Sequence, residues 1–145
     1  MNLQGYEVLA DDEYLNFEFL SIGKKGTIRK IVMFRSIGFN IYNLALGDLE
    51  ESTGVVNDDA RTNNGDRDKV LATVAEIVVD FLEHHPGATV LAIGATPARS
   101  RLFQTGLNTI WESIKGLYVF EGYLNNEWED FAPAKNYEAF TIKSK

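Results

Sequence analysis

Residues 94–101 carry the side chains whose types and spacing point most directly to chemistry. Their sequence is GATPARSR, in which Thr96 is placed to cap a helix that begins at Pro97. Arg99 and Arg101 fall in the first turns of that helix, where cations oppose the positive end of the helix dipole. A phosphate or carboxylate bound to the free N–H groups would offset this cost, so the segment predicts an anion site. Salt bridges to acidic residues of the same chain are the alternative, since such surface pairs are common.

Residues 58–68, with the sequence DDARTNNGDRD, form the second candidate segment. We expect its central part to face the arginine pair across the ends of neighbouring strands, with Asn63, Asn64 and Asp66 as ligand-binding residues. One alternative is a Ca²⁺ or Mg²⁺ site, but an EF-hand register with Gly65 at the sixth position would start at Ala60, which cannot be a ligand. Another is a solvated loop with turn and cap residues. The sequence predicts no metal site and no cofactor.

Composition bounds the class of protein. The chain has 145 residues, 45% of them hydrophobic, which is the size and character of one globular domain. Lys plus Arg is 14 and Asp plus Glu is 21, so the net charge of −7 argues against nucleic-acid binding and against docking on anionic membranes. The absence of cysteine excludes disulfides, zinc ribbons and thiol catalysis. Residues 1–12 show no targeting pattern, and we expect a cytoplasmic protein.

Hydrophobic periodicity predicts a single α+β domain over residues 1–145. Strand patterns cover residues 14–22, 27–37, 39–46, 88–93, 117–123 and 137–142. Helical spacing covers residues 66–84, which Pro86 and Gly87 terminate, and a second helix opens at Thr96–Pro97 and closes at Gly116. The expected fold is a mixed six-stranded sheet, in the order β-β-β-α-β-α-β-β, with two helices packed on it.

The remaining chemically capable side chains favour structural roles. His84 and His85 end the first helix, and no nucleophile pattern lies near them, so no catalytic residue is assigned. Aromatic residues at strand or helix spacing are expected in the core, and they are Phe17, Phe19, Phe34, Phe39, Trp111 and Phe120. Asn125 and Asn126 are expected to make a turn. Trp128 lies in the same polar turn region, so we expect it to be an interface residue.

Several blocks together give the chain a family resemblance. They are YNLALGD at residues 42–48, NNGD at 63–66, GATPARSRLF at 94–103, WEDF at 128–131 and YEAF at 137–140. With these blocks the sequence resembles a family of small uncharacterised bacterial proteins, over nearly the whole chain. The resemblance implies that the NNGD and arginine blocks are family features, and it implies no activity.

A second resemblance concerns architecture. The element order is similar to the later part of the Gcn5-related acetyltransferase fold, with residues 61–65 where that fold holds its acyl-CoA loop. The sequence departs from that fold's glycine-rich basic loop, because Gly65 is the one glycine and four aspartates surround it. Those carboxylates would repel a pyrophosphate.

These observations favour a non-enzymatic binding protein with an anion site at a helix N-terminus. Its ligand would be a small molecule bearing phosphate or carboxylate. An acyltransferase-like enzyme that binds coenzyme A is one alternative. Membership of a bacterial two-protein regulatory pair, in which the acidic surface meets a basic protein partner, is another.

Overall fold

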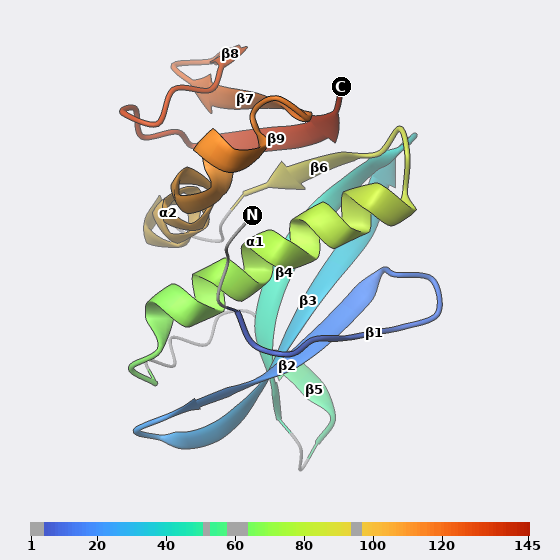
Figure 1. Cartoon of the computed structure of the whole chain (residues 1–145), viewed down its shortest axis with the longest axis vertical. Coiled ribbons are helices and arrows are strands. Elements are labelled where there is room, and N and C mark those ends of the chain that lie inside the picture. Colours follow the sequence, from blue (N-terminus) through green and yellow to red (C-terminus); the bar gives the residue numbers. More distant parts are fainter. Residues whose placement is uncertain (1–4, 51–52, 58–63, 94–96) are drawn as a thin grey trace.

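The chain folds around one large sheet, seen here in a computed structural model that describes residues 5–50, 53–57, 64–93 and 97–145 (Figure 1). Within those ranges the elements are β1 (Leu9–Ala10), β2 (Asn16–Gly23), β3 (Gly26–Gly38), β4 (Ile41–Glu50), β5 (Val55–Asn57), α1 (Arg67–His84), β6 (Thr89–Ala92), α2 (Pro97–Ile114), β7 (Tyr118–Leu124), β8 (Glu127–Asp130) and β9 (Ala139–Ser144).

The sheet is mixed, as expected, but it is larger than the sequence predicted. Eight strands follow one hydrogen-bonded path in the order β1-β2-β3-β4-β6-β9-β7-β8, and β5 pairs with β4 off that path. The pair β4–β6 is parallel, and the other pairs are antiparallel. The α+β class is confirmed, and the count of six strands is wrong.

The strands that periodicity missed are short or polar. β1 has two residues and β5 has three, too few to show an alternating pattern. β8 reads Glu-Trp-Glu-Asp, which lacks the alternation of a half-buried strand. It pairs through a tight turn in which Asn125 and Asn126 have φ angles of 54° and 65°. The predicted turn at these asparagines is therefore confirmed, although the strand after it was not predicted.

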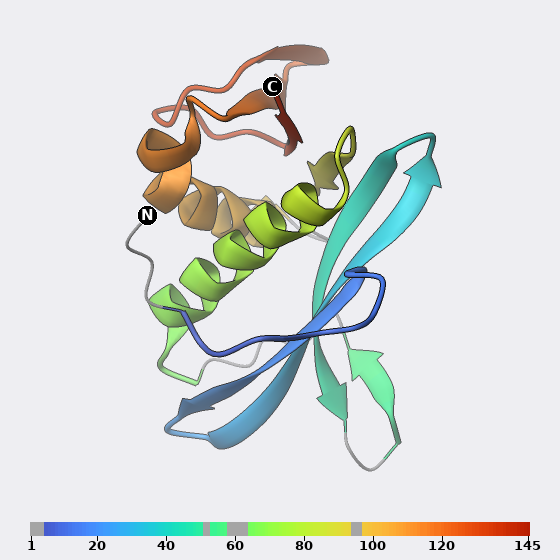
Figure 2. The ribbon, with the colours of Figure 1, turned by 45° about the vertical axis from the view of Figure 1, so that its right-hand side comes forward.

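Both helices lie on one side of the sheet (Figure 2). The apolar stripe of α1 packs across β2–β4, where the ring centroids of Phe34 and Phe81 lie 4.0 Å apart. Burying one such side chain contributes roughly 1.5–3 kcal/mol. α2 packs beside α1 and covers β9, with Phe103 and Leu107 lining the same interior space as Phe140. No helix among the described residues is long and apolar enough to cross a lipid bilayer.

One expected core residue lies outside the core. The side chain of Phe39 is 92% exposed, so its predicted burial is wrong. β3 ends at Gly38 and β4 begins at Ile41, with Asn40 at a φ of 55°. Phe39 is therefore part of the tight turn between the two strands, which leaves its side chain in solvent.

Gly122 of β7 provides a test of the packing around β9. A Cβ added to Gly122 would lie 2.3 Å from Cδ1 of the buried Tyr137 ring, so Gly122→Ala must displace that ring. We expect the substitution to lower the free energy of unfolding by about 1–3 kcal/mol, measured by urea denaturation. Gly116→Ala is the matched control, because a Cβ there meets no atom within 4 Å. Equal midpoints for the two variants would contradict this account.

Candidate functional site

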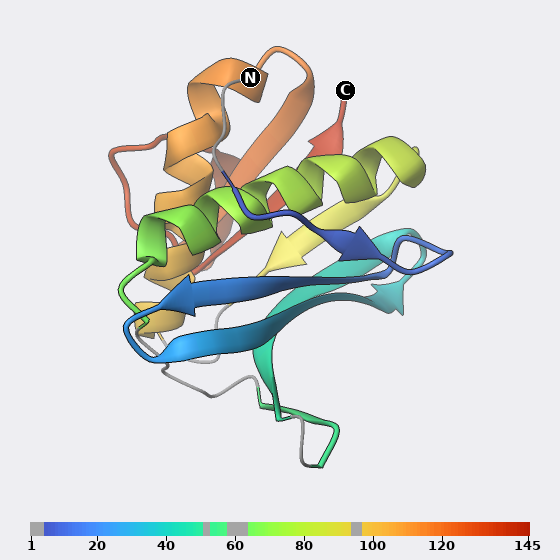
Figure 3. The ribbon, with the colours of Figure 1, turned by 60° about the horizontal axis from the view of Figure 1, so that its bottom comes forward.

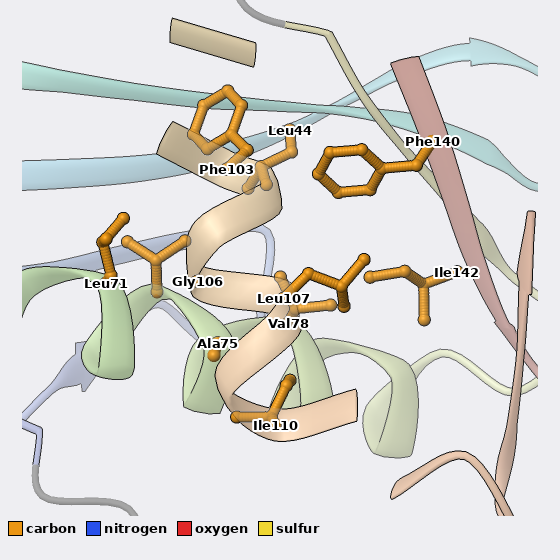
Figure 4. A pocket seen from close by; sticks show the side chains of 11 residues that line it. Leu44, Leu71, Ala75, Val78, Phe103, Gly106, Leu107, Ile110, Phe140 and Ile142 are labelled. Carbon is orange, nitrogen blue, oxygen red and sulfur yellow. The ribbon is translucent and has the colours of Figure 1, made fainter. Parts of the chain in front are cut away.

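The predicted site residues that the structure describes, Asn64, Asp66 and Arg101, lie at the end of the molecule where both helices begin. α1 starts at Arg67, and α2 starts at Pro97 on the same side of the sheet (Figure 3). The helices cross where Leu71 of α1 packs against Gly106 of α2 (Figure 4), and their first turns lie at the same end of the molecule (Figure 3). Asn63 and Thr96 lie outside the described residues, as does the side chain of Arg99.

The side chain of Asn64 bonds to backbone groups within the fold. Its side chain is buried, with 2% of the residue exposed. Oδ1 accepts a hydrogen bond from the Lys25 backbone N–H at 2.6 Å, and Nδ2 donates to the Gly26 carbonyl at 2.9 Å. The Lys24 N–H also donates to the Asn64 carbonyl at 3.1 Å. Asn64 thus fastens the turn between β2 and β3 to the start of α1.

Asp66 occupies the N-cap position of α1, but its side chain does not cap the helix. Oδ2 accepts hydrogen bonds from Ser21 Oγ and from the Tyr6 hydroxyl, each at 2.5 Å. Burial raises the pKa of Asp66, but the bonds from Ser21 and Tyr6 outweigh burial and hold the pKa below its ordinary value. Burial, followed by the bond to Asp66, raises the pKa of the Tyr6 phenol. Asp66 therefore joins three segments of the chain as an anion.

A buried ion pair completes this polar layer. Lys30 Nζ lies 2.5 Å from Asp48 Oδ1, and the two residues are register partners on β3 and β4. Both are buried residues. The positive charge of Lys30 also helps to lower the pKa of Asp66. We name this set, which comprises Tyr6, Ser21, Lys30, Asp48, Asn64 and Asp66, the polar layer.

Sequence reasoning missed four members of the polar layer. Ser21 continues the inward phase of Phe17 and Phe19 on β2, and Lys30 precedes Val32 in the inward phase of β3. A polar residue in an inward phase is the signal that could have found both of them. Nothing in the sequence pattern marks Tyr6, whose role depends on the path of the N-terminal segment across α1.

Exposed cations surround the polar layer on the outside. They are Lys24, Lys25, Arg67, Lys69 and Arg101. The Cγ and Cδ atoms of Lys24 lie 3.8 Å from the position that a Cβ added to Gly65 would occupy. Lys69 Nζ lies 4.3 Å from the centroid of the Tyr6 ring. None of the five forms an ion pair with a described residue. Five exposed cations and the exposed carboxylate of Asp68 therefore lie on the described residues of this end, in a protein with a net charge of −7.

The sheet opens at the same end. β4 and β6 pair only through Ile41–Asn43 and Thr89–Leu91, and β6 ends at Ala92. β4 continues to Glu50 and gains β5 as a partner from Asp48 onward. No described strand pairs with residues 44–47 on that side, which leaves backbone N–H and C=O groups for other partners.

A small cavity lies in the interior beside this opening. It has a volume of about 30 Å³ and lies between the helices and the sheet (Figure 4). Its walls are apolar side chains, which include Leu44, Phe103 and Phe140. The cavity is water-sized and offers no polar partner, so it is not a site for an anion.

The other predicted residues have separate environments. The ring of His84 stacks on that of Tyr14, with 3.6 Å between the ring centroids, and His85 Nε2 lies 2.9 Å from the Glu13 carbonyl oxygen. Both histidines therefore hold the N-terminal segment against the end of α1. Trp128 is 47% exposed on β8. In the part of the chain that the structure describes, no group of three or more His, Asp or Glu side chains could hold a metal ion. Most of the acidic segment 58–68 lies outside the described residues.

The lowered pKa of Asp66 predicts a specific dependence of stability on pH. A carboxyl whose folded pKa lies below its ordinary value of 3.8 stabilises the fold above about pH 4, and this stability is lost as the pH falls through the folded pKa. We expect Asp66→Asn to cost about 1–3 kcal/mol at pH 7 and progressively less as the pH falls below 3.8, measured by urea denaturation. The exposed Asp68 is the control, and Asp68→Asn should retain the acid dependence. Parallel wild-type and Asp66→Asn curves would contradict the assignment.

The buried ion pair predicts non-additive substitutions. Lys30→Met removes the cation beside the buried Asp48 carboxylate, and we expect it to cost about 3–5 kcal/mol of unfolding free energy. The double variant Lys30→Met/Asp48→Leu removes both charges and should recover most of that loss. Thermal and urea unfolding of the single and double variants measure the difference. A double variant that is less stable than Lys30→Met would show that the pair is not the source of the effect.

Comparison with known proteins places the whole chain in one family. No match is found among curated proteins, and none is found among solved structures. A family model matches residues 2–145 and is described as a family of unknown function, DUF6934. That match confirms the family resemblance indicated by the sequence blocks, and the chain is a member of the DUF6934 family.

Proposed function

We propose that this protein binds a small anionic molecule, bearing phosphate or carboxylate, at the end where α1 and α2 begin. The observation that carries the proposal is the group of five exposed cations at that end, none of which is paired with a described acidic residue. Cations that pair with no described acidic residue, gathered on a protein of net charge −7, favour an anionic ligand over a general electrostatic role.

In such a site the polar layer provides structural support, and the exposed cations contact the ligand. Asn64 and Asp66, which the sequence suggested as ligand contacts, hold the β2–β3 turn and the start of α1 in place. Arg101 is exposed on the first turns of α2, beside the N–H groups that a helix N-terminus leaves free. We therefore propose that Arg99, Arg101 and Thr96 contact the anion, with Asn63 beside them and the polar layer as support.

A titration followed by backbone-resolved NMR tests the proposal. Inorganic phosphate, ATP and coenzyme A are added in turn to ¹⁵N-labelled protein, and we expect saturable shifts at residues 64–69 and 97–101. The double variant Arg99→Glu/Arg101→Glu should abolish them, because it reverses the charge that attracts the anion.

The control variant changes the net charge equally at distant positions. Arg35→Glu/Lys145→Glu alters two exposed cations, on β3 and at the C-terminal end, and should leave the titration unchanged. Equal loss in both double variants would show a general charge effect, and scattered shifts in the unmodified protein would remove the site.

Coenzyme A binding in an acyltransferase-like enzyme is the second candidate. The separation of β4 and β6 supports it, because residues 44–47 pair with no described strand on that side, and the element order is similar to the later part of the Gcn5-related fold. The free backbone groups of residues 44–47 could pair with the amides of an extended pantetheine arm. Coenzyme A would then shift residues 44–47 as well and bind more tightly than ATP, whereas equal binding of phosphate, ATP and coenzyme A would leave the simple anion site.

A further inference from the structure

The edge strand β8 combines an exposed indole with a backbone edge that pairs with no described strand, although the Asp130 carbonyl accepts a hydrogen bond from the Tyr137 hydroxyl at 3.4 Å. It ends the described sheet and pairs with β7 alone. Trp128 lies in its centre, 47% exposed, with its ring centroid 5.1 Å from that of Tyr123 on β7. β8 lies at the top of Figure 1 and the start of α1 lies near the bottom, so this edge is remote from the proposed anion site.

The hairpin register directs the backbone of Trp128 outward. Leu124 and Glu127 flank the two-residue turn and form its first hydrogen-bonded pair, so the next pair, Tyr123 and Trp128, is a non-hydrogen-bonded one. The Tyr123 carbonyl accordingly accepts a bond from Glu138 on the side of β9, at 2.9 Å. The N–H and C=O of Trp128 therefore point away from β7, and no described strand lies there. An unpaired edge of this kind is a template for another strand.

The face around Trp128 has the chemistry that recognises a guanidinium group. Glu121 and Asp130 are direct register partners, on the face that also holds the Tyr123–Trp128 pair. Tyr137 packs on Gly122, on the opposite face. Two carboxylates opposite each other repel, and neither forms an ion pair with a described cation. A guanidinium can bond both carboxylates and stack on the indole at the same time.

We propose that the free edge of β8 docks an extended, arginine-bearing segment of a partner protein, which adds to the sheet as its next strand. An arginine of that segment lies over Trp128, between Glu121 and Asp130. A second copy of this chain is excluded by charge, because β8 against β8 would place Glu127, Glu129 and Asp130 opposite the same carboxylates. Lysine fits less well because it lacks the planar fork and the stacking surface of arginine. This surface is independent of the anion site.

The experiment uses the full chain with Trp128 as its one fluorescent indole. Trp111→Phe removes the other tryptophan. An alternating arginine–valine peptide of seven residues is titrated, alongside versions with lysine or glutamate in place of arginine. We expect a saturable change in Trp128 emission with the arginine peptide, weaker binding of the lysine peptide and none of the glutamate peptide. Absence of binding by the arginine peptide, or equal binding of all three, overturns the proposal.

Matched variants separate the site from the overall charge. Glu121→Gln/Asp130→Asn should weaken binding of the arginine peptide by about fivefold, which is the effect of losing two solvent-accessible charge contacts. Glu83→Gln/Asp12→Asn removes the same two charges from exposed positions elsewhere and should leave binding unchanged. Equal weakening in both double variants overturns the site.

A backbone-modified peptide tests the addition of a strand. Two arginine peptides are methylated on alternate backbone nitrogens, so that each lacks the N–H donors of one edge. A strand that pairs with β8 through a single edge requires that one of these peptides loses binding and the other retains it. Equal binding of both methylated peptides and the unmodified one overturns strand addition.

Discussion

The polar groups buried beneath the start of α1 must all find partners, and this requirement shapes one end of the molecule. A buried carboxylate or amide without a partner would cost several kcal/mol of stability. Asp66 meets the requirement with bonds from β2 and from the N-terminal segment, and Asn64 meets it with bonds to the β2–β3 turn. In the described residues no buried side-chain nitrogen or oxygen lacks a hydrogen-bond partner. Four segments that are distant in sequence are thereby fixed together: the N-terminal segment, the hairpin, the connection before α1 and α1 itself.

The internal polar groups of this end and its exposed cations have separate partners. The internal carboxylates of the polar layer bond to Lys30 or to hydroxyl donors. They form no ion pair with the described cations at the surface. Lys24, Lys25, Arg67 and Arg101 consequently face solvent without an acidic partner in the described chain. A surface anion site built in this way is held by a rigid base, because the turn that carries Lys24 and Lys25 is bonded to the same asparagine that precedes α1.

The pairing of strands is incomplete at two places in the described sheet. In its middle, β4 and β6 separate after three paired residues, and at its end β8 has one neighbour. The exposed cations lie near the first of these openings, and the acidic strand with Trp128 forms the second. The charges of the two surfaces suit opposite partners, an anionic small molecule and a cationic protein segment. Both helices pack on the same side of the sheet, so the face that holds Trp128 stays open.

The sequence by itself determined the features that depend on local periodicity and turn chemistry. The stripe from Leu71 to Leu82 determined α1, and the paired asparagines at 125 and 126 determined a tight turn. The sequence also placed the family correctly, because its blocks extend along the chain. Tertiary structure alone decided which polar residues bond within the fold, since Asn64 and Asp66 show the same letters whether they bind a ligand or bond to Ser21. It also decided that a strand of acidic residues pairs with β7. The physical reason is that periodicity reports only which face of an element is apolar, whereas hydrogen-bond partners and sheet edges depend on segments brought together from distant parts of the chain.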